Sequence, residues 1–209
     1  GTALLIGASG FFVLYLAGLD WRIIVGGALV GGLTFWGAWE FNWLHDYQKE
    51  RILTVFNPQQ DAQDAGWHTT QAAIAIGSGG LLGKGWLNGT QTHLEFLPEK
   101  HTDFIFAVYG EEFGLLGCAV LVLLYLLMIG RCFLIAANAS TLFGRLMAGS
   151  MTLMFFTYAF VNMGMVTGML PVVGVPLPFM SFGGTALMTL FIAVGILMSV
   201  QTHRKLVNS

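Results

Sequence analysis

The chain alternates long apolar runs with shorter polar connections, which is the pattern of a protein that crosses a membrane several times. A transmembrane helix requires about 20 mainly apolar residues. Five stretches of the 209-residue sequence meet this requirement: 1–19, 21–43, 104–129, 143–169 and 185–201. We therefore predict an all-α fold, a polytopic transmembrane helical bundle with about five spans in a single membrane domain over residues 1–209.

Composition supports the membrane class and excludes others. The hydrophobic fraction is 56% and the mean hydropathy is +0.72, whereas apolar residues including Gly make up about half of a soluble protein. The net charge of -2 and the absence of a basic stripe exclude a polybasic nucleic-acid binder. Cys118 and Cys132 share one apolar stretch, where a helix would hold them roughly 20 Å apart, so we expect free thiols.

Basic residues in the short connections predict the orientation, because Lys and Arg concentrate on the cytoplasmic side. If the spans alternate, all of these basic residues fall on one side. The connections 45–103 and 170–184 then lie outside as two extracellular loops. The first span begins abruptly with neither Met nor a basic region, so we expect a truncated or processed start and a piece of a larger protein. The orienting residues are Arg22, Arg131, Arg145, Arg204 and Lys205.

The long connection 45–103 carries features of folded structure. Loops of this length in a compact protein are usually functional or disordered, and this one holds the half-apolar run Thr70–Trp86. That run suits a short helix that lies at the interface or dips into the protein. Its glycines, beside Lys84, could form backbone nests for phosphate oxygens. The alternative is that they allow close packing or a tight bend; they are Gly77, Gly79, Gly80, Gly83 and Gly85.

Charged residues crowd the stretch "EKHTDFIF", directly ahead of the third span. Thr102 or Asp103 would be a suitable N-cap for a helix beginning at Phe104, which is a purely structural explanation. Two carboxylates, Glu111 and Glu112, follow about two turns inside the span, and ionisable residues at such depth are functional candidates. Helical geometry places Asp103 and Glu111 about a quarter turn apart, so we expect them to line one cavity open to the outside.

The second outer connection is irregular. Pro171, Pro176 and Pro178 disfavour a helix, and irregular backbone beside a span is tolerated where it packs inside protein or lines a cavity. Asn162 in the preceding span is a candidate to tie this loop down. A packing hydrogen bond is the favoured role for such an Asn, ahead of a ligand contact.

Two segments resemble a known family. "NMGMVTGMLPVVGVPLPFMSFGGTA", Asn162–Ala186, and "LPEKHTDFIFAVYGEEFGLLG", Leu97–Gly117, are similar to the signature and the large loop of the SEDS proteins (shape, elongation, division and sporulation). The "GTQT" motif resembles the rod-shape-determining branch more than the division branch. Because the family has ten spans, the resemblance implies that this chain is its C-terminal half.

The resemblance implies a peptidoglycan glycosyltransferase that polymerises lipid II, a disaccharide-pentapeptide on undecaprenyl pyrophosphate, during cell elongation. It implies a multi-pass protein of the bacterial cytoplasmic (inner) membrane whose active loop faces the periplasm, working with a class B penicillin-binding protein. Asp103 matches the family's essential loop acid. Since a sugar hydroxyl must lose a proton as it attacks, Asp103 is our expected general base.

Positive charge must compensate the leaving pyrophosphate. Lys84 and Lys100 are the loop candidates, and a divalent cation, Mg²⁺ or Mn²⁺, held by Glu111 or Glu112 is the alternative; no cofactor is certain. His101 is a candidate proton relay. The expected substrate-binding residues are Lys84, Glu99, Lys100, His101, Glu111, Glu112 and Ser181.

Two other classes of function fit these residues. A lipid II flippase or transporter would use Asp103, Glu111 and Glu112 to bind a headgroup or proton without making a bond. A noncatalytic scaffold of the elongation complex would use the loop only as an interaction surface. Replacement of Asp103 by Asn separates the three, since only a catalytic base would lose polymerisation while keeping substrate and partner binding.

Overall fold

A computed structural model describes residues 20–41, 65–90, 101–170 and 172–202, together with residues 10, 13, 17 and 18. The described part is all-helical, as predicted, and four of its helices are long and apolar enough to cross a membrane. The first predicted span lies almost wholly outside the described residues. The helices are α2 (Trp21–Glu40), α4 (Ala65–Gly79), α6 (Ile105–Ala137), α7 (Leu142–Val166) and α8 (Gly184–Thr202).

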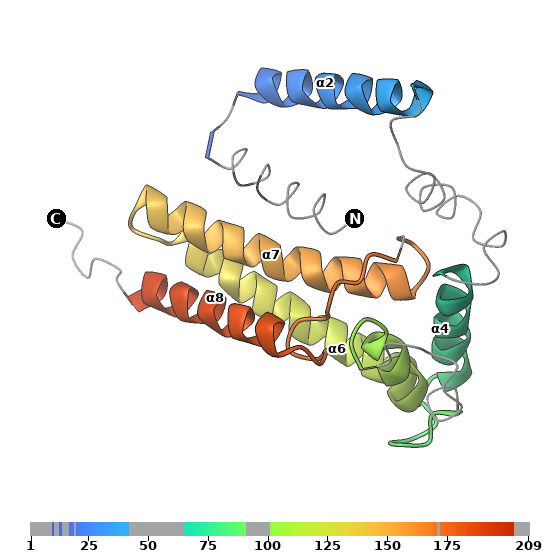
Figure 1. Ribbon diagram of the computed structural model, residues 1–209. Helices are drawn as coiled ribbons and strands as arrows, with labels where there is room; N and C mark the ends of the chain where they lie inside the picture. The colour runs from blue at the N-terminus through green and yellow to red at the C-terminus, as the bar shows by residue number, and fades with distance from the viewer. Residues whose placement is uncertain are drawn as a thin grey trace.

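Helices α6, α7 and α8 lie side by side and form the bundle, while α4 packs against the beginning of α6 (Figure 1). The segment after α4, the start of α6, the end of α7 and the start of α8 meet at one end of this bundle. The two connections predicted to share a side therefore share an end, which we call the loop end. Helix α4 is the short helix expected in the long connection, although it begins and ends earlier in the chain.

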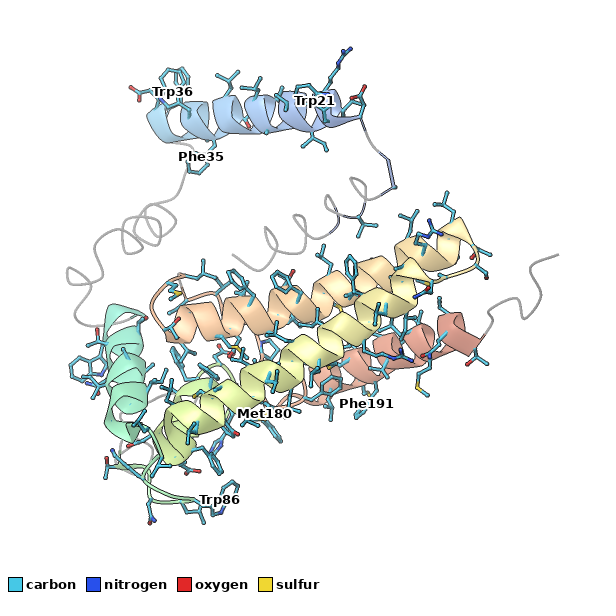
Figure 2. The ribbon with its side chains drawn as sticks, turned by 180° about the vertical axis from the view of Figure 1, so that it is seen from behind. Trp21, Phe35, Trp36, Trp86, Met180 and Phe191 are labelled. Atoms are coloured by element: carbon cyan, nitrogen blue, oxygen red, sulfur yellow. The ribbon has the colours of Figure 1, made fainter. Side chains whose placement is uncertain are left out.

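Helix α2 stands apart from the bundle, and its apolar side chains are exposed around its circumference (Figures 1 and 2). Trp21 and Trp36, for example, are each 66% exposed. Apolar side chains also cover the outward faces of α6 and α8, including Leu127 and Phe191. Such surfaces are stable in lipid, whose hydrocarbon solvates them without the cost that water imposes.

Two clusters of buried side chains hold the bundle together. Near the loop end, Ala72 and Ala75 of α4 are fully buried against α6, since their small side chains permit close approach. Toward the other end, Phe155 of α7 packs with Leu190 and Leu197 of α8. Both cysteines are free and buried, which confirms the expected thiols.

The start of α6 differs from the prediction. Its N-cap residue is Phe104, which makes no side-chain cap hydrogen bond, so the expected Thr102 or Asp103 N-cap is wrong. The residues 101–104 form turns instead of the first helical position. The helix also continues to Ala137, beyond the predicted end near 129, because apolar residues follow Arg131 for another turn.

Helix α6 is broken at Gly114, whose φ of 65° and ψ of -164° are not helical. In a regular helix the amides of Leu115 and Leu116 would donate to the carbonyls of Glu111 and Glu112. Here they donate to the carbonyls of Gly80 (2.9 Å) and Leu81 (3.1 Å). The segment 80–85, which we call the inserted turn, thus takes the place of helical bonds.

The inserted turn also donates hydrogen bonds to the two carbonyls of α6 that lose their helical partners at the break. The Lys84 amide donates to Glu111 O and the Gly85 amide donates to Glu112 O, both at 3.0 Å. Buried backbone groups in a membrane protein need such partners, because hydrocarbon offers none. The break in α6 is therefore satisfied by a segment about 30 residues earlier in the chain.

Candidate functional site

Asp103 lies at the loop end, immediately before Phe104 and α6, and its side chain is partly buried. Its carboxylate reaches the second connection: a Cβ placed on Gly174 would lie 3.1 Å from Asp103 Oδ2. Gly174 has a φ of +68°, a conformation that side-chain-bearing residues rarely adopt. A glycine at this position thus leaves room for the acid against the backbone of the loop.

Asn162 of α7 links Asp103 to the second connection through hydrogen bonds. Its Nδ2 donates to the backbone oxygen of Asp103 at 2.9 Å and to that of Val175 at 2.7 Å. The Asn162 side chain is completely buried. The expectation that Asn162 ties the second connection down through packing hydrogen bonds is confirmed.

Four further hydrogen bonds organise the second connection, one within it and three to its neighbours. The Ser181 hydroxyl accepts from the Leu177 amide at 2.7 Å and donates to the Thr102 carbonyl. The Phe182 amide donates to the His101 carbonyl at 2.8 Å. From the middle of α6, the Tyr125 hydroxyl donates to Pro178 O at 2.6 Å. The backbone from His101 to Asp103 is consequently held by donors from distant parts of the chain: Phe182, Ser181 and Asn162.

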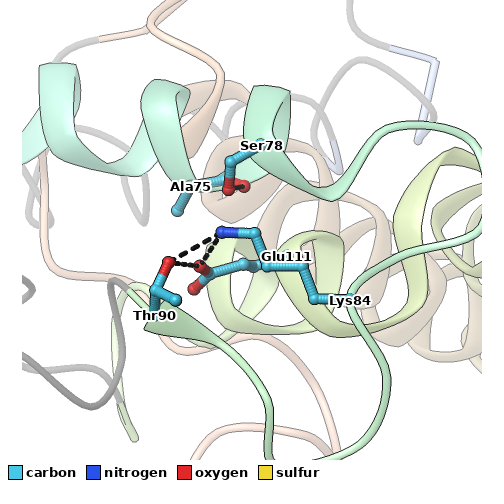
Figure 3. A network of polar contacts seen from close by, with 5 residues as sticks. All are labelled: Ala75, Ser78, Lys84, Thr90 and Glu111. Atoms are coloured by element: carbon cyan, nitrogen blue, oxygen red, sulfur yellow. Dashed lines mark hydrogen bonds and ion pairs between the residues drawn. The ribbon is translucent and has the colours of Figure 1, made fainter.

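A second polar cluster lies behind the inserted turn (Figure 3). Lys84 Nζ donates to Glu111 Oε1 at 2.7 Å and to Thr90 Oγ1 at 2.8 Å, and the Thr90 hydroxyl donates to the same carboxylate oxygen at 3.1 Å. The Glu111 side chain is 0% exposed. The prediction that Glu111 lines a cavity open to the outside is therefore wrong, because this carboxylate is enclosed and paired.

Two glycines, Gly79 at the end of α4 and Gly83 of the inserted turn, pack closely against α6. A Cβ on Gly79 would lie 2.2 Å from Gly110 O, and one on Gly83 would lie 2.1 Å from Glu112 O. The amides of Lys84 and Gly85 already donate to α6. These two amides are therefore already paired and cannot belong to a phosphate nest in this arrangement, and the alternative, close packing, holds for Gly79 and Gly83.

The sequence of this chain matches a known protein family and several of its members. The profile of the FtsW, RodA and SpoVE proteins, described as "Cell cycle protein", matches residues 1–206. The chain belongs to the SEDS family. It is 55% identical, over 208 residues, to the peptidoglycan glycosyltransferase MrdB of Escherichia coli K12, covering 100% of this chain and 56% of that protein. It is 42% identical to the peptidoglycan glycosyltransferase RodA of Treponema pallidum over 161 residues, 77% of this chain and 37% of that protein.

A solved structure of a relative supports the SEDS fold as well. It is described as "Structural coordination of polymerization and crosslinking by a peptidoglycan synthase complex" and matches with a TM-score of 0.78 at 30% identity. The match covers 98% of this chain and 56% of that one. This SEDS chain thus spans a little over half the length of the MrdB relative and of the solved structure.

The structure places two of the four remaining predicted site residues of the SEDS chain. Glu99 and Lys100 lie outside the described residues. His101 is exposed beside Asp103, and Glu112 is buried, at 8% exposure, beside the inserted turn. Within the described part of the chain, no three His, Cys, Asp or Glu side chains come close enough to hold a metal ion.

Several residues that shape the site were not singled out from the sequence. Thr90 belongs to the "GTQT" motif, but no local pattern connects it to Glu111. Tyr125 reads as an apolar residue of a span, although a tyrosine hydroxyl buried there calls for a hydrogen-bond partner. Gly114, inside an apolar run, was the available signal for a break, since glycine weakens a helix interior.

Replacing Asn162 by Leu is expected to destabilise the SEDS protein, because the buried carbonyl of Val175 loses its donor at a cost of about 1–3 kcal/mol, and the part-buried carbonyl of Asp103 loses its donor as well. The free energy of unfolding in detergent measures the effect. Thr152→Val in the same helix is the matched control: its hydroxyl donates only to Ala148 O, one turn away, and the expected loss is about 1 kcal/mol or less. Equal losses in the two variants would contradict a specific role for Asn162.

Proposed function

We propose that this chain is the C-terminal part of a peptidoglycan glycosyltransferase that polymerises lipid II during cell elongation. The names of its MrdB and RodA relatives support this function. We place the loop end on the outer, periplasmic face of the cytoplasmic membrane, as the basic residues at the opposite ends of the spans favour. Residues 45–103 and 170–184 are then its two extracellular loops.

The observation that carries the proposal is the set of hydrogen bonds that fix the backbone at Asp103. Its backbone oxygen is held by Asn162, and its neighbours Thr102 and His101 are held by Ser181 and Phe182. Asp103 as a residue is meanwhile only partly buried at the loop end. A general base needs this combination of fixed position and access, because proton transfer requires the base within hydrogen-bond reach of its substrate.

The reaction that we assign is a displacement at a sugar carbon. The hydroxyl oxygen of one sugar attacks the anomeric carbon of another, the bond from that carbon to the pyrophosphate oxygen breaks, and the configuration inverts. Asp103 accepts the hydroxyl proton as the new bond forms. The undecaprenyl pyrophosphate of the attacked sugar leaves with the electron pair of the broken bond, and the product is two linked disaccharides that still carry the undecaprenyl pyrophosphate of the attacking substrate.

Other residues have supporting roles in this proposal. Lys100 and His101 lie three and two residues before Asp103 in the sequence; we assign Lys100 to compensate the charge of the pyrophosphate and His101 to relay a proton, with Glu99 as a further substrate-binding residue. The rest of the full-length protein supplies further walls and charges. A class B penicillin-binding protein is the proposed partner that crosslinks the product, and the relative whose structure concerns polymerisation and crosslinking supports it.

Polymerisation by the full-length protein tests the proposal. The parent protein is purified with its transpeptidase partner, incubated with labelled lipid II and Mg²⁺, and resolved on a gel, where a ladder of glycan strands is expected. A parallel sample in vesicles measures movement of lipid II between leaflets. Translocation without any ladder would replace the enzyme by a transporter, and the absence of both would favour a scaffold.

A further inference from the structure

We infer that the buried Lys84–Glu111 pair and the inserted turn position Asp103 by fixing the direction of the first segment of α6, residues 105–113. This inference rests on the proposed function of Asp103. It assigns Lys84 and Glu111 as positioning residues of the reaction, acting from within the protein. It differs from the expectation that they bind substrate or a cation.

The break at Gly114 is the first step of the argument. A continuous helix transmits direction along its axis through its own hydrogen bonds, and at Gly114 those bonds are replaced. The segment 105–113, with Asp103 two residues ahead of it, therefore does not inherit its direction from the long segment 115–137. Something outside the helix has to set the angle between the two segments.

The inserted turn supplies that constraint on the backbone. Its amides bond to the last carbonyls of the first segment, Glu111 O and Glu112 O, while its carbonyls bond to the first amides of the second segment, at Leu115 and Leu116. The four bonds thus bridge the two sides of the break. A Cβ on Gly114 would lie 2.3 Å from Gly83 N, so the turn and the break fit against each other without free space.

The ion pair locks the turn in this place. Lys84 comes from the inserted turn and Glu111 from the first segment, so their contact joins the two parts through side chains as well as through the backbone. Thr90 closes the triangle by accepting from Lys84 and donating to Glu111 (Figure 3). On the outer side, Trp86 packs on Phe113 with ring centroids 5.8 Å apart. Removing the Lys84 charge leaves the fully buried Glu111 carboxylate uncompensated, which strongly disfavours the closed arrangement, whereas the Lys84 side chain is 26% exposed and keeps some access to solvent.

Burial argues for positioning rather than for contact with substrate. The Glu111 side chain is 0% exposed, so it cannot touch a sugar or a pyrophosphate unless the turn leaves the break. The Lys84 side chain is 26% exposed, but its ammonium is already bonded to two oxygens. A shift of about 1 Å in a catalytic group can lower a rate about 100-fold, so small changes in the direction of the first segment are sufficient to affect Asp103.

The test combines kinetics and a distance measurement on the full-length protein. Steady-state polymerisation gives kcat and KM for lipid II in the wild type, Lys84→Met and Glu111→Gln. Separately, spin labels at His101 and Leu127, one on each side of the break, are measured by electron double resonance in the same three backgrounds with other cysteines replaced. Thermal unfolding confirms that each variant is folded at the assay temperature.

For Lys84→Met we expect kcat to fall at least about tenfold with KM within about twofold, and the label distance to broaden or shift. Glu111→Gln keeps an oxygen that accepts from Lys84 and Thr90, so we expect it to retain the wild-type distance and most of the activity. Retained activity in Glu111→Gln would show that the hydrogen bonds, rather than the charge of Glu111, hold the first segment in place.

Three results would overturn the inference. A rise in KM with unchanged kcat in Lys84→Met would make Lys84 a substrate ligand. An unchanged label distance would show that the pair does not set the direction of the first segment, and a changed distance with wild-type kcat would show that this direction does not matter to Asp103. If the wild type makes no polymer, the proposed function fails by itself, and an unchanged label distance in Lys84→Met still overturns the inference.

Discussion

Replacing Asp103 by Asn is expected to reduce glycan polymerisation by about 10²–10⁴-fold, the usual contribution of a general base. Asn has nearly the same shape and can keep hydrogen bonds as an acceptor, but it cannot take the proton from the attacking hydroxyl. The hydrogen bond from Asn162 goes to the backbone oxygen of residue 103, so it survives the change. We therefore expect a folded protein that binds lipid II and its partner but makes no ladder.

Two further variants sharpen this prediction. Asp103→Glu keeps the base but displaces it by one methylene, so an intermediate rate is expected. Asp20→Asn removes an exposed carboxylate ahead of α2, far along the chain from the loop end, and should leave the rate within about twofold. Wild-type ladders from Asp103→Asn would show that the base lies elsewhere, in Glu112, in residues 91–100 or in the rest of the protein.

Replacing Gly83 by Ala is expected to prevent the inserted turn from entering the break in α6. The new Cβ would lie 2.1 Å from Glu112 O and 2.5 Å from its carbonyl carbon, and backbone cannot move aside as a flexible side chain can. Gly83 also has a φ of +81°, which costs an L-residue about 1–2 kcal/mol. Expelling the turn breaks four backbone hydrogen bonds, and each buried group left unpaired costs about 1–3 kcal/mol.

These costs together approach the whole stability of a typical domain, about 5–15 kcal/mol, so we expect little folded Gly83→Ala protein. The yield of monodisperse protein in detergent and its thermal midpoint measure the effect. Gly80→Ala is the matched control, because its φ of +58° carries a similar strain but a Cβ there meets nothing within 4 Å. If both variants were equally stable, the fit of the turn into α6 would not be the constraint that we describe.

The candidate site shows which residues local reasoning can assign. Asn162 was predicted to bond the second connection because a fully polar side chain deep in a span has few alternatives, and it does so. Glu111 was assigned to an open cavity from its helical azimuth alone. Azimuth specifies a direction from the helix axis but not what lies there, and Lys84, 27 residues earlier, occupies that place. The Ser181 hydroxyl joins the second connection to the carbonyl of Thr102, and its predicted contact with substrate stays a prediction.

The sequence by itself determined the membrane class, the described spans, the short helix of the long connection and the free thiols. These follow from the length and apolarity of local runs, because hydrocarbon requires each spanning segment to satisfy its own backbone. Only the tertiary structure decided the break at Gly114, the inserted turn and the closure of the second connection over Asp103. Those features join residues far apart in the chain, and their energies depend on distances and burial that no local pattern contains.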